Sequence, residues 1–388
     1  MAAMVGGVYL SLEFDMSAVL TQVRRHDGMR RLGKRLERRC KSMAYSLLAR
    51  FSRESQAVSP ETLQNVHRVL LVRPNFRLGN AVIGARLIEA FASSRPDIAI
   101  DYLGTDTTSQ LFKHMPLKRY YAHSRSFSWR LWALIRLILA LRRNRYDLAI
   151  QVGEGSLTSW LFLQLCGANR LLGQPGRLQH TYDWLLDDTT RHAYDLSGNI
   201  ARALGLTCQR LPWMLVTKDE ATHVETLLPS ATRGGVVGLF VGGHLDKRLP
   251  LNFWLSLLES LNESRERYLV MLGPEEEQHR SALTKACGAQ GRILPLLPLR
   301  DFAAALTHVI TLITPDTGPM HIASALGVPV VAVLNSEKSY KFVPHGIADK
   351  ALYQPSAEDV MACLRRSPLL GSPGMRTEHM LDRKMLLH

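Results

Sequence analysis

Four residues that can bind or transform a sugar phosphate lie within one short stretch of the chain: Asp316, Thr317, Gly318 and His321. They follow an apolar run at residues 309–313 and precede a segment of small residues. This order predicts a strand, a turn and a helix, with the polar groups at the carboxyl end of the strand, where parallel sheets bind ligands. A helix start suits a phosphate, and Asp316 can accept hydrogen bonds from sugar hydroxyls. In the alternative interpretation, Asp316 or Thr317 only caps the helix.

Apolar strands alternate with helices from residue 66 onward. The expected strands are 67–72, 97–103, 146–152, 235–241, 268–272, 309–313 and 328–334. The expected helices are 80–92, 127–143, 158–166, 250–261, 301–306 and 356–366. The pattern restarts after a polar stretch at 218–233, which predicts an α/β protein with two Rossmann-like domains facing each other.

Composition limits the class of protein and its partners. A chain of 388 residues has room for two domains of ordinary size. Its formal net charge of +14 indicates an anionic partner such as a nucleotide phosphate or an acidic lipid. The cysteines are widely separated, which favours reduced thiols in a cytoplasm and argues against a zinc site or a disulfide framework. They are Cys40, Cys166, Cys208, Cys287 and Cys363.

The N-terminal region reads as a basic helical extension. Apolar residues recur at spacings of three and four between Met29 and Phe51, and arginines and lysines crowd the rest of that surface. Such a helix can lie on an anionic membrane or dock on the body of the protein. A nucleic-acid partner is not expected, because no aromatic residues are interleaved with the charges. The first residues, 1–14, make a poor signal peptide, and the apolar segment 127–141 is too short to span a bilayer.

Five blocks of the chain together resemble one known family, glycosyltransferase family 9, the ADP-heptose:lipopolysaccharide heptosyltransferases. The segment from Asp316 onward and the basic loop Gly242–Pro250, which contains Lys247, form the most specific pair. The blocks are Val69–Asn80, Arg145–Gly153 with Asn169–Gly173 after it, Gly242–Pro250, Leu272–Glu277 and the segment from Asp316 onward.

The resemblance implies a GT-B fold, with two Rossmann-like domains and a cleft between them. It implies an inverting transfer of heptose from a nucleotide sugar, ADP-heptose first, to a lipopolysaccharide core or another anionic cell-envelope glycolipid. Neither a metal ion nor another cofactor is expected. The expected division is a helical extension at 1–65, an acceptor domain at 66–225, a nucleotide-sugar domain at 226–355, and a helix and tail at 356–388. The enzyme is expected in the cytoplasm, at the inner face of the bacterial inner membrane.

The resemblance assigns donor binding to the second half of the chain. Lys247, with Arg248 beside it, is expected on the donor phosphate, together with Thr317, Gly318 and His321. Glu276 is expected on the ribose of the nucleotide. The alternatives are that Lys247 is a solvated loop lysine and that the glutamates at 275–277 only favour a helix start through its dipole.

The acceptor side departs from the family. Arg73 and Arg77 are expected to meet an anionic acceptor, although both also fit ordinary surface charges. The family commonly has Gly-Asp in the first turn, with the aspartate as the proposed base, whereas this chain has Gly79-Asn80. An amide takes no proton at neutral pH, so Asn80 can only orient the acceptor.

Three explanations follow for Asn80. Asp316 or Glu154 serves as the base, the transition state is loose and the proton leaves late, or activity is lost. Two further interpretations of the whole chain are a nucleotide-sugar epimerase or hydrolase of the same fold, and a non-catalytic family member.

Overall fold

The structure is a computed structural model that describes residues 54–125, 131–187, 190, 192–228 and 235–366. These residues belong to one compact unit that begins at Glu54. The predicted basic helix near residues 29–51 lies outside them. Within the described residues, no helix has both the length and the apolar character needed to cross a membrane.

The first lobe is built on a parallel sheet of seven described strands in the order β1-β7-β6-β5-β2-β3-β4. Its strands are β1 (Gln56–Ala57), β2 (Arg68–Val72), β3 (Ala99–Thr105), β4 (Arg119–His123), β5 (Leu148–Gln151), β6 (Arg170–Gly173) and β7 (Trp184–Leu185). Its helices are η1 (Pro60–Leu63), α3 (Leu78–Gly84), α4 (Arg86–Ser94), η2 (Asp106–Phe112), α5 (Leu131–Arg142), α6 (Leu157–Leu165), η4 (Gln179–Thr181) and α7 (Ala193–Ala203).

The second lobe follows helix α8 (Lys218–Leu227) and is built on a parallel sheet of six described strands in the order β10-β9-β8-β11-β12-β13. Its strands are β8 (Val236–Val241), β9 (Tyr268–Leu272), β10 (Gly291–Ile293), β11 (Val309–Thr314), β12 (Val330–Leu334) and β13 (Lys350–Tyr353). Its helices are η6 (Leu245–Lys247), α9 (Leu251–Glu263), η7 (Pro274–His279), α10 (Arg280–Ala286), α11 (Leu299–Leu306), α12 (Gly318–Ala325), η8 (Glu337–Phe342) and α13 (Ala357–Arg365).

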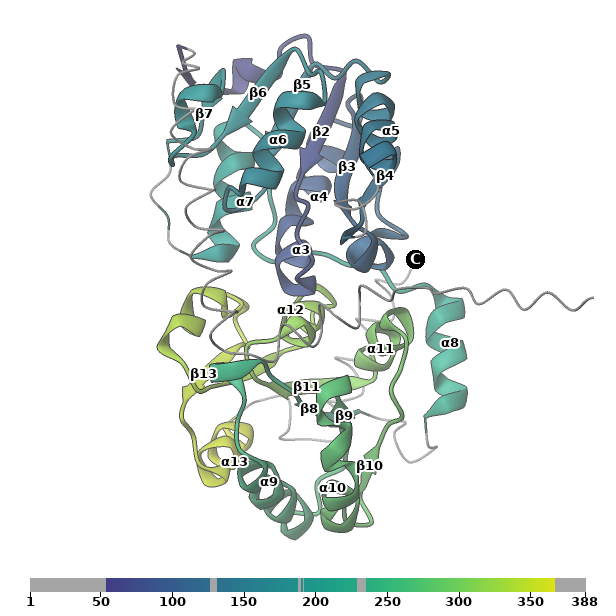
Figure 1. Cartoon of the computed structure of the whole chain (residues 1–388). Helices are drawn as coiled ribbons and strands as arrows, with labels where there is room; N and C mark the ends of the chain where they lie inside the picture. The colour runs from purple at the N-terminus through teal and green to yellow at the C-terminus, as the bar shows by residue number, and fades with distance from the viewer. Residues whose placement is uncertain (1–53, 126–130, 188–189, 191, 229–234, 367–388) are drawn as a thin grey trace, which may run out of the picture. The chain divides into compact units, whose positions relative to one another are not determined.

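Helices cover both faces of each sheet, which explains why the central strands are apolar on both sides. In the first lobe, α5 and α6 pack on one face and α4 and α7 on the other (Figure 1). In the second lobe, α9, α10 and α13 cover one face and α11 and α12 the other. The largest apolar cluster continues from the α4 and α7 face of the first lobe into the α11 and α12 face of the second. Apolar packing therefore joins the two lobes.

The predicted α/β class with two sheets is confirmed. The predicted helix at 80–92 is two helices, α3 and α4, which meet at Ala85. The described part of the predicted extension, 1–65, contributes strand β1 to the first sheet, because Gln56 and Ala57 pair with β7. The domain boundaries at 65, 225 and 355 stay predictions.

Candidate functional site

The chemistry-bearing residues of the second lobe gather where the strand order of its sheet reverses. The chain runs from β8 outward to β9 and β10, then returns to β11 on the other side of β8. The carboxyl ends of β8 and β11 therefore border a topological switch point, the place where open parallel sheets bind ligands. The loop after β8 carries Lys247, and the turn after β11 carries Asp316.

Lys247 and Asp316 form an ion pair at this point. The distance between Lys247 Nζ and Asp316 Oδ2 is 2.5 Å, and the exposed fractions of the two side chains are 31% and 4%. Lys247 Nζ also lies 5.2 Å from the ring centre of Phe342, within the range of a cation–π contact. Lys247 is thus a partly exposed cation held in an ion pair at the switch point.

The turn at Thr317 leaves the start of α12 without a side-chain cap. Thr317 is the N-cap residue, but its side chain makes no cap hydrogen bond. Its hydroxyl instead donates to Pro315 O at 3.2 Å. Capping therefore does not explain Asp316, whose carboxylate is turned to Lys247. A helix start of this kind adds partial positive charge beside the ammonium.

His321 extends the ion pair into the first lobe. Its Nε2 lies 3.9 Å from Asp316 Oδ1, and its Nδ1 lies 2.7 Å from the hydroxyl of Tyr194 on α7. Burial lowers the pKa of His321 to about 4, which outweighs the opposite effect of Asp316, so the ring is neutral at neutral pH. Burial likewise raises the pKa of Tyr194, which stays a phenol. Successive polar contacts thus run from Lys247 through Asp316 and His321 in the second lobe to Tyr194 in the first.

Gly79 is needed for this connection because of its close approach to His321. A Cβ atom added at Gly79 would lie 2.2 Å from Cδ2 of His321, far inside van der Waals contact. On the other side, a Cβ at Gly318 would lie 3.2 Å from Cβ of Leu78. The first turns of α3 and α12 are therefore in contact, and half-buried Asn80 lies next to that contact.

The three glutamates after β9 have different surroundings. Arg248 Nη2 lies 2.7 Å from Glu275 Oε2 and 3.0 Å from Glu276 Oε1. Glu276 is buried, and burial raises the pKa of its carboxyl despite the neighbouring Arg248. Glu277 instead pairs with Arg280 at 2.6 Å. A helix dipole alone does not explain a buried glutamate that is held by an arginine.

The predicted acceptor residues border the corresponding switch point of the first sheet, between β2 and β5. Arg73 Nη1 donates to Val152 O at 2.5 Å, so its guanidinium lies against the backbone that follows β5. Gly153, at φ +95°, leaves the space for it. Arg77 is exposed. Glu154 is also exposed, and its carboxylate lies 3.5 Å from Nζ of Lys341.

The structure thus brings together Lys247, Asp316, Thr317, Gly318 and His321, with Gly79 and Asn80 beside them. Glu276 belongs to the neighbouring Arg248 group, and Arg73 and Arg77 belong to the first lobe's own switch point. Tyr194 escaped the sequence analysis. No motif surrounds it, and only the packing of α7 against α12 reveals it.

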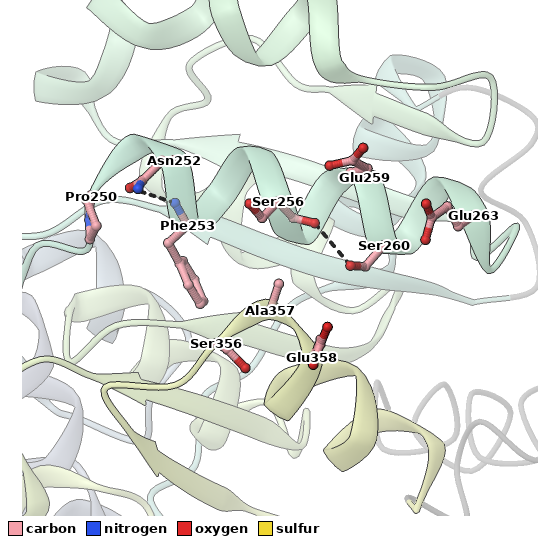
Figure 2. A pocket seen from close by; sticks show the side chains of 10 residues that line it. All are labelled: Pro250, Asn252, Phe253, Ser256, Glu259, Ser260, Glu263, Ser356, Ala357 and Glu358. Atoms are coloured by element: carbon pink, nitrogen blue, oxygen red, sulfur yellow. Dashed lines mark hydrogen bonds between the residues drawn. The ribbon is translucent and has the colours of Figure 1, made fainter.

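A separate hollow of about 470 Å³ lies between α9 and the start of α13 (Figure 2). None of the predicted site residues lines it. Its lining residues are Pro250, Asn252, Phe253, Ser256, Glu259, Ser260, Glu263, Ser356, Ala357 and Glu358. Its carboxylates would repel a phosphate, so we do not assign the nucleotide sugar to it.

Comparisons with solved structures identify the fold. E. coli heptosyltransferase WaaC with ADP-2-deoxy-2-fluoro heptose has a TM-score of 0.62 at 20% identity, covering 77% of this chain and 99% of that one. A family 9 glycosyl transferase from Veillonella parvula DSM 2008 has a TM-score of 0.66 at 16% identity, covering 86% and 99%. E. coli ADP-heptose lps heptosyltransferase II has a TM-score of 0.62 at 17% identity, covering 81% and 99%. No curated protein gives a significant sequence match.

The model of the family described as glycosyltransferase family 9 (heptosyltransferase) matches residues 134–370, which is more than half of the chain. This match spans the whole second lobe, including Lys247 and Asp316, and confirms the resemblance noted in the sequence. The solved structures confirm the predicted GT-B fold. The chain therefore belongs to glycosyltransferase family 9 and is a glycosyltransferase.

Proposed function

We propose that this glycosyltransferase moves a heptose, or a related sugar, from a nucleotide diphosphate sugar to an anionic glycolipid of the cell envelope. ADP-heptose is the first candidate donor and the lipopolysaccharide core the first candidate acceptor. The observation that carries the proposal is the Lys247–Asp316 pair, which lies beside the uncapped start of α12 at the switch point of the second sheet.

Donor binding would rearrange this pair. A pyrophosphate offers Lys247 a doubly charged partner in place of one carboxylate, and the start of α12 adds its amide groups. We expect Thr317 and Gly318 to bring the backbone close to the phosphates and His321 to hold the turn. Glu276, held by Arg248 at 3.0 Å, would accept hydrogen bonds from the ribose hydroxyls.

The reaction would proceed with inversion and without a metal ion. An acceptor hydroxyl oxygen bonds to the anomeric carbon, and the bond from that carbon to the phosphate oxygen breaks. The electron pair of the broken bond leaves with the nucleoside diphosphate, whose charge Lys247 stabilises. The proton of the acceptor hydroxyl passes to a base.

Asp316 is our candidate for that base. Its carboxylate is buried at the switch point, and it loses its partner when Lys247 turns to the phosphate. Glu154 is the second candidate, but its side chain is 88% exposed and faces Lys341. Asn80 would orient the acceptor hydroxyl, and Arg73 and Arg77 would attract the anionic groups around it.

A donor screen tests the proposal. Purified full-length protein is given a panel of nucleotide sugars, with and without a glycolipid acceptor extract, and release of nucleoside diphosphate is measured. We expect release from ADP-heptose that depends on acceptor and persists with a chelator. Consumption of donor without acceptor would instead indicate an epimerase or hydrolase. Donor binding without turnover, unchanged in Asp316→Ala, would indicate a non-catalytic protein.

Contact with the inner face of the bacterial inner membrane belongs to the same proposal, through the basic segment at residues 29–51. Each lysine or arginine near an anionic surface contributes about 1 kcal/mol. Removing residues 1–53 leaves strand β1 intact. The shortened protein should no longer sediment with anionic liposomes but should still glycosylate a soluble acceptor. Undiminished sedimentation would contradict this part of the proposal.

A further inference from the structure

Two histidines and an aspartate meet where the start of α7 in the first lobe contacts the segment between η8 and β13 in the second. His192 is the N-cap residue of α7, and Asp195 lies one turn later on the same helix. His345 comes from the second lobe. All three side chains are half-buried, and one ligand atom from each lies within 4.8 Å of the others. We propose that His192, Asp195 and His345 bind a transition-metal dication, Zn²⁺ in the first place, that joins the two lobes.

The three ligand atoms are close enough to hold one ion after local movement. His192 Nε2 and His345 Nε2 are 2.8 Å apart, and a carboxylate oxygen of Asp195 lies within 4.8 Å of one nitrogen of each histidine. Zinc–nitrogen bonds of 2.0–2.1 Å in a tetrahedral site hold two nitrogens about 3.3 Å apart. The two rings therefore need to separate by roughly half an ångström, and the Asp195 carboxylate needs to approach them by up to about 1.5 Å. The side chains of His345 and Asp195 are 32% and 43% exposed, so an ion can reach them.

The hydrogen bonds of His192 must change for it to bind an ion. Without metal, His192 Nδ1 accepts from Tyr194 N at 3.4 Å, and Nε2 lies 3.2 Å from Tyr340 O. Ligation through Nε2 requires its proton to move to Nδ1, which gives up these two hydrogen bonds and the hydrogen bond of 2.8 Å with His345 Nε2.

The donor set selects the class of ion. Two imidazoles and one carboxylate suit zinc, cobalt, nickel or copper, whereas magnesium and calcium prefer oxygen ligands. Three protein ligands leave a fourth position for water. The widely spaced cysteines argue only against a thiolate site. They do not bear on a site whose histidines are separated by about 150 residues of sequence and meet through the fold.

This site would act on structure and not on the transferred sugar. The bound ion would fix the start of α7, which carries Tyr194 and thus its hydrogen bond to His321. It would also hold the second-lobe segment after Phe342, whose ring lies near Lys247. Saturation with Zn²⁺ should therefore raise the thermal midpoint of the protein.

Calorimetric titration of chelator-treated full-length protein with Zn²⁺ tests the proposal, and Co²⁺ absorption reports the ligands. We expect one tight site and a Co²⁺ spectrum without thiolate charge transfer. His345→Ala and the milder Asp195→Asn should each weaken Zn²⁺ binding by more than about 10-fold and remove the Zn²⁺-dependent rise in thermal midpoint. Mg²⁺ at the same concentration should have no effect.

His223→Ala is the matched control. That histidine also lies near a carboxylate, with Nε2 4.0 Å from Asp301 Oδ2, but its side chain is 61% exposed and lies outside the cluster. Its removal should leave tight binding unchanged. Equal Zn²⁺ affinity of the wild type and both cluster variants would overturn the proposal. So would the absence of any tight site in a wild type whose circular dichroism shows it folded.

Discussion

Both lobes place a strand, a turn and a short helix at the switch point of a parallel sheet, but the two turns carry different chemistry. In the second lobe, β11 leads to Asp316, whose carboxylate is held at 2.5 Å by Lys247. In the first lobe, β2 leads to Arg73, which bonds to the backbone at Val152, and then to Asn80. The turn of the second lobe holds a carboxylate and an ammonium as an ion pair. In the first lobe, the guanidinium of Arg73 instead bonds to the backbone that follows strand β5.

This difference divides the proposed work between the lobes. A leaving group that gains negative charge needs preorganised cations and helix starts, and the second turn has both. An acceptor hydroxyl needs orientation, for which a neutral amide such as Asn80 suffices. The two turns touch through Gly79 and His321. The comparison therefore predicts large effects from charge changes in the second turn and small effects in the first.

The largest effect is expected for Lys247→Ala. Loss of the ammonium removes the cation that would stabilise the departing phosphate, and kcat/KM for the donor should fall by about 100- to 1,000-fold. Nucleoside diphosphate release at varied donor concentration measures it. Lys338→Ala, an exposed lysine of η8, loses the same charge and should stay near wild type. Equal losses of kcat/KM in the two variants would contradict the proposal that the second turn binds the leaving group.

His321 should make the stability of the folded protein depend on pH. Its pKa is lowered by burial to about 4 in the folded protein, against about 6.5 in an unfolded chain. The unfolded chain therefore binds more protons between these values, and the folded protein loses stability as the pH falls from 6.5 toward 4. Between pH 7 and pH 5, this one group should cost about 2 kcal/mol of unfolding free energy.

In the variant His321→Asn, the free energy of unfolding should not show the part of the decrease between pH 7 and pH 5 that His321 causes. Denaturant unfolding of the wild type and the variant at both pH values measures it, and His223→Asn, an exposed histidine, serves as the control. If the wild type and His321→Asn lose equal stability on acidification, His321 is not the buried neutral group described above.

Tyr194→Phe tests whether the contact between the lobes positions the second turn. The change removes the hydroxyl 2.7 Å from His321 Nδ1. It leaves a buried nitrogen without that hydrogen-bond partner, which should lower the free energy of unfolding by about 1–3 kcal/mol. We expect kcat/KM to fall about 10-fold, with little change for exposed Tyr353→Phe. Unchanged kinetics in Tyr194→Phe, with lowered stability, would reduce Tyr194 to a packing residue.

The sequence predicts most of the central strands, because buried parallel strands are continuous apolar runs, but it misses the interior strand β6, which has only four residues, Arg170–Gly173. Residues 268–272 were predicted and observed as β9, and 309–313 became β11 with one residue added. The edge strands β4 and β10 escaped prediction, because each is short and carries polar residues such as Arg119 and Arg292. Their strand character comes from pairing with β3 and β9.

The site was predictable only where its residues are neighbours in sequence. Asp316 to His321 form one motif, and Lys247 was found by resemblance to a family. Tyr194 and the cluster of His192 and His345 depend on how α7 packs against the second lobe. No local pattern marks them, since side chains more than 100 residues apart meet only through tertiary packing.

The smallest effect, and the sharpest test of the first turn, is expected for Asn80→Asp. If the acceptor hydroxyl lies at Asn80, a carboxylate there can both accept its hydrogen bond and take its proton. Transfer should then be preserved or rise by up to about 10-fold, with a rate that increases with pH as the new carboxyl ionises. Glycolipid transfer between pH 5 and 8 measures this.

Asn80→Ala provides the matched control, because it removes the amide without adding a charge. It should lose several-fold of kcat/KM, since an orienting hydrogen bond contributes about 1 kcal/mol. If the transfer rate of Asn80→Asp falls below that of Asn80→Ala, a negative charge is repelled at this position. The donor phosphate and not the acceptor would then lie against the first turn. The two turns would share the leaving group, and the base would have to be sought elsewhere on the first lobe.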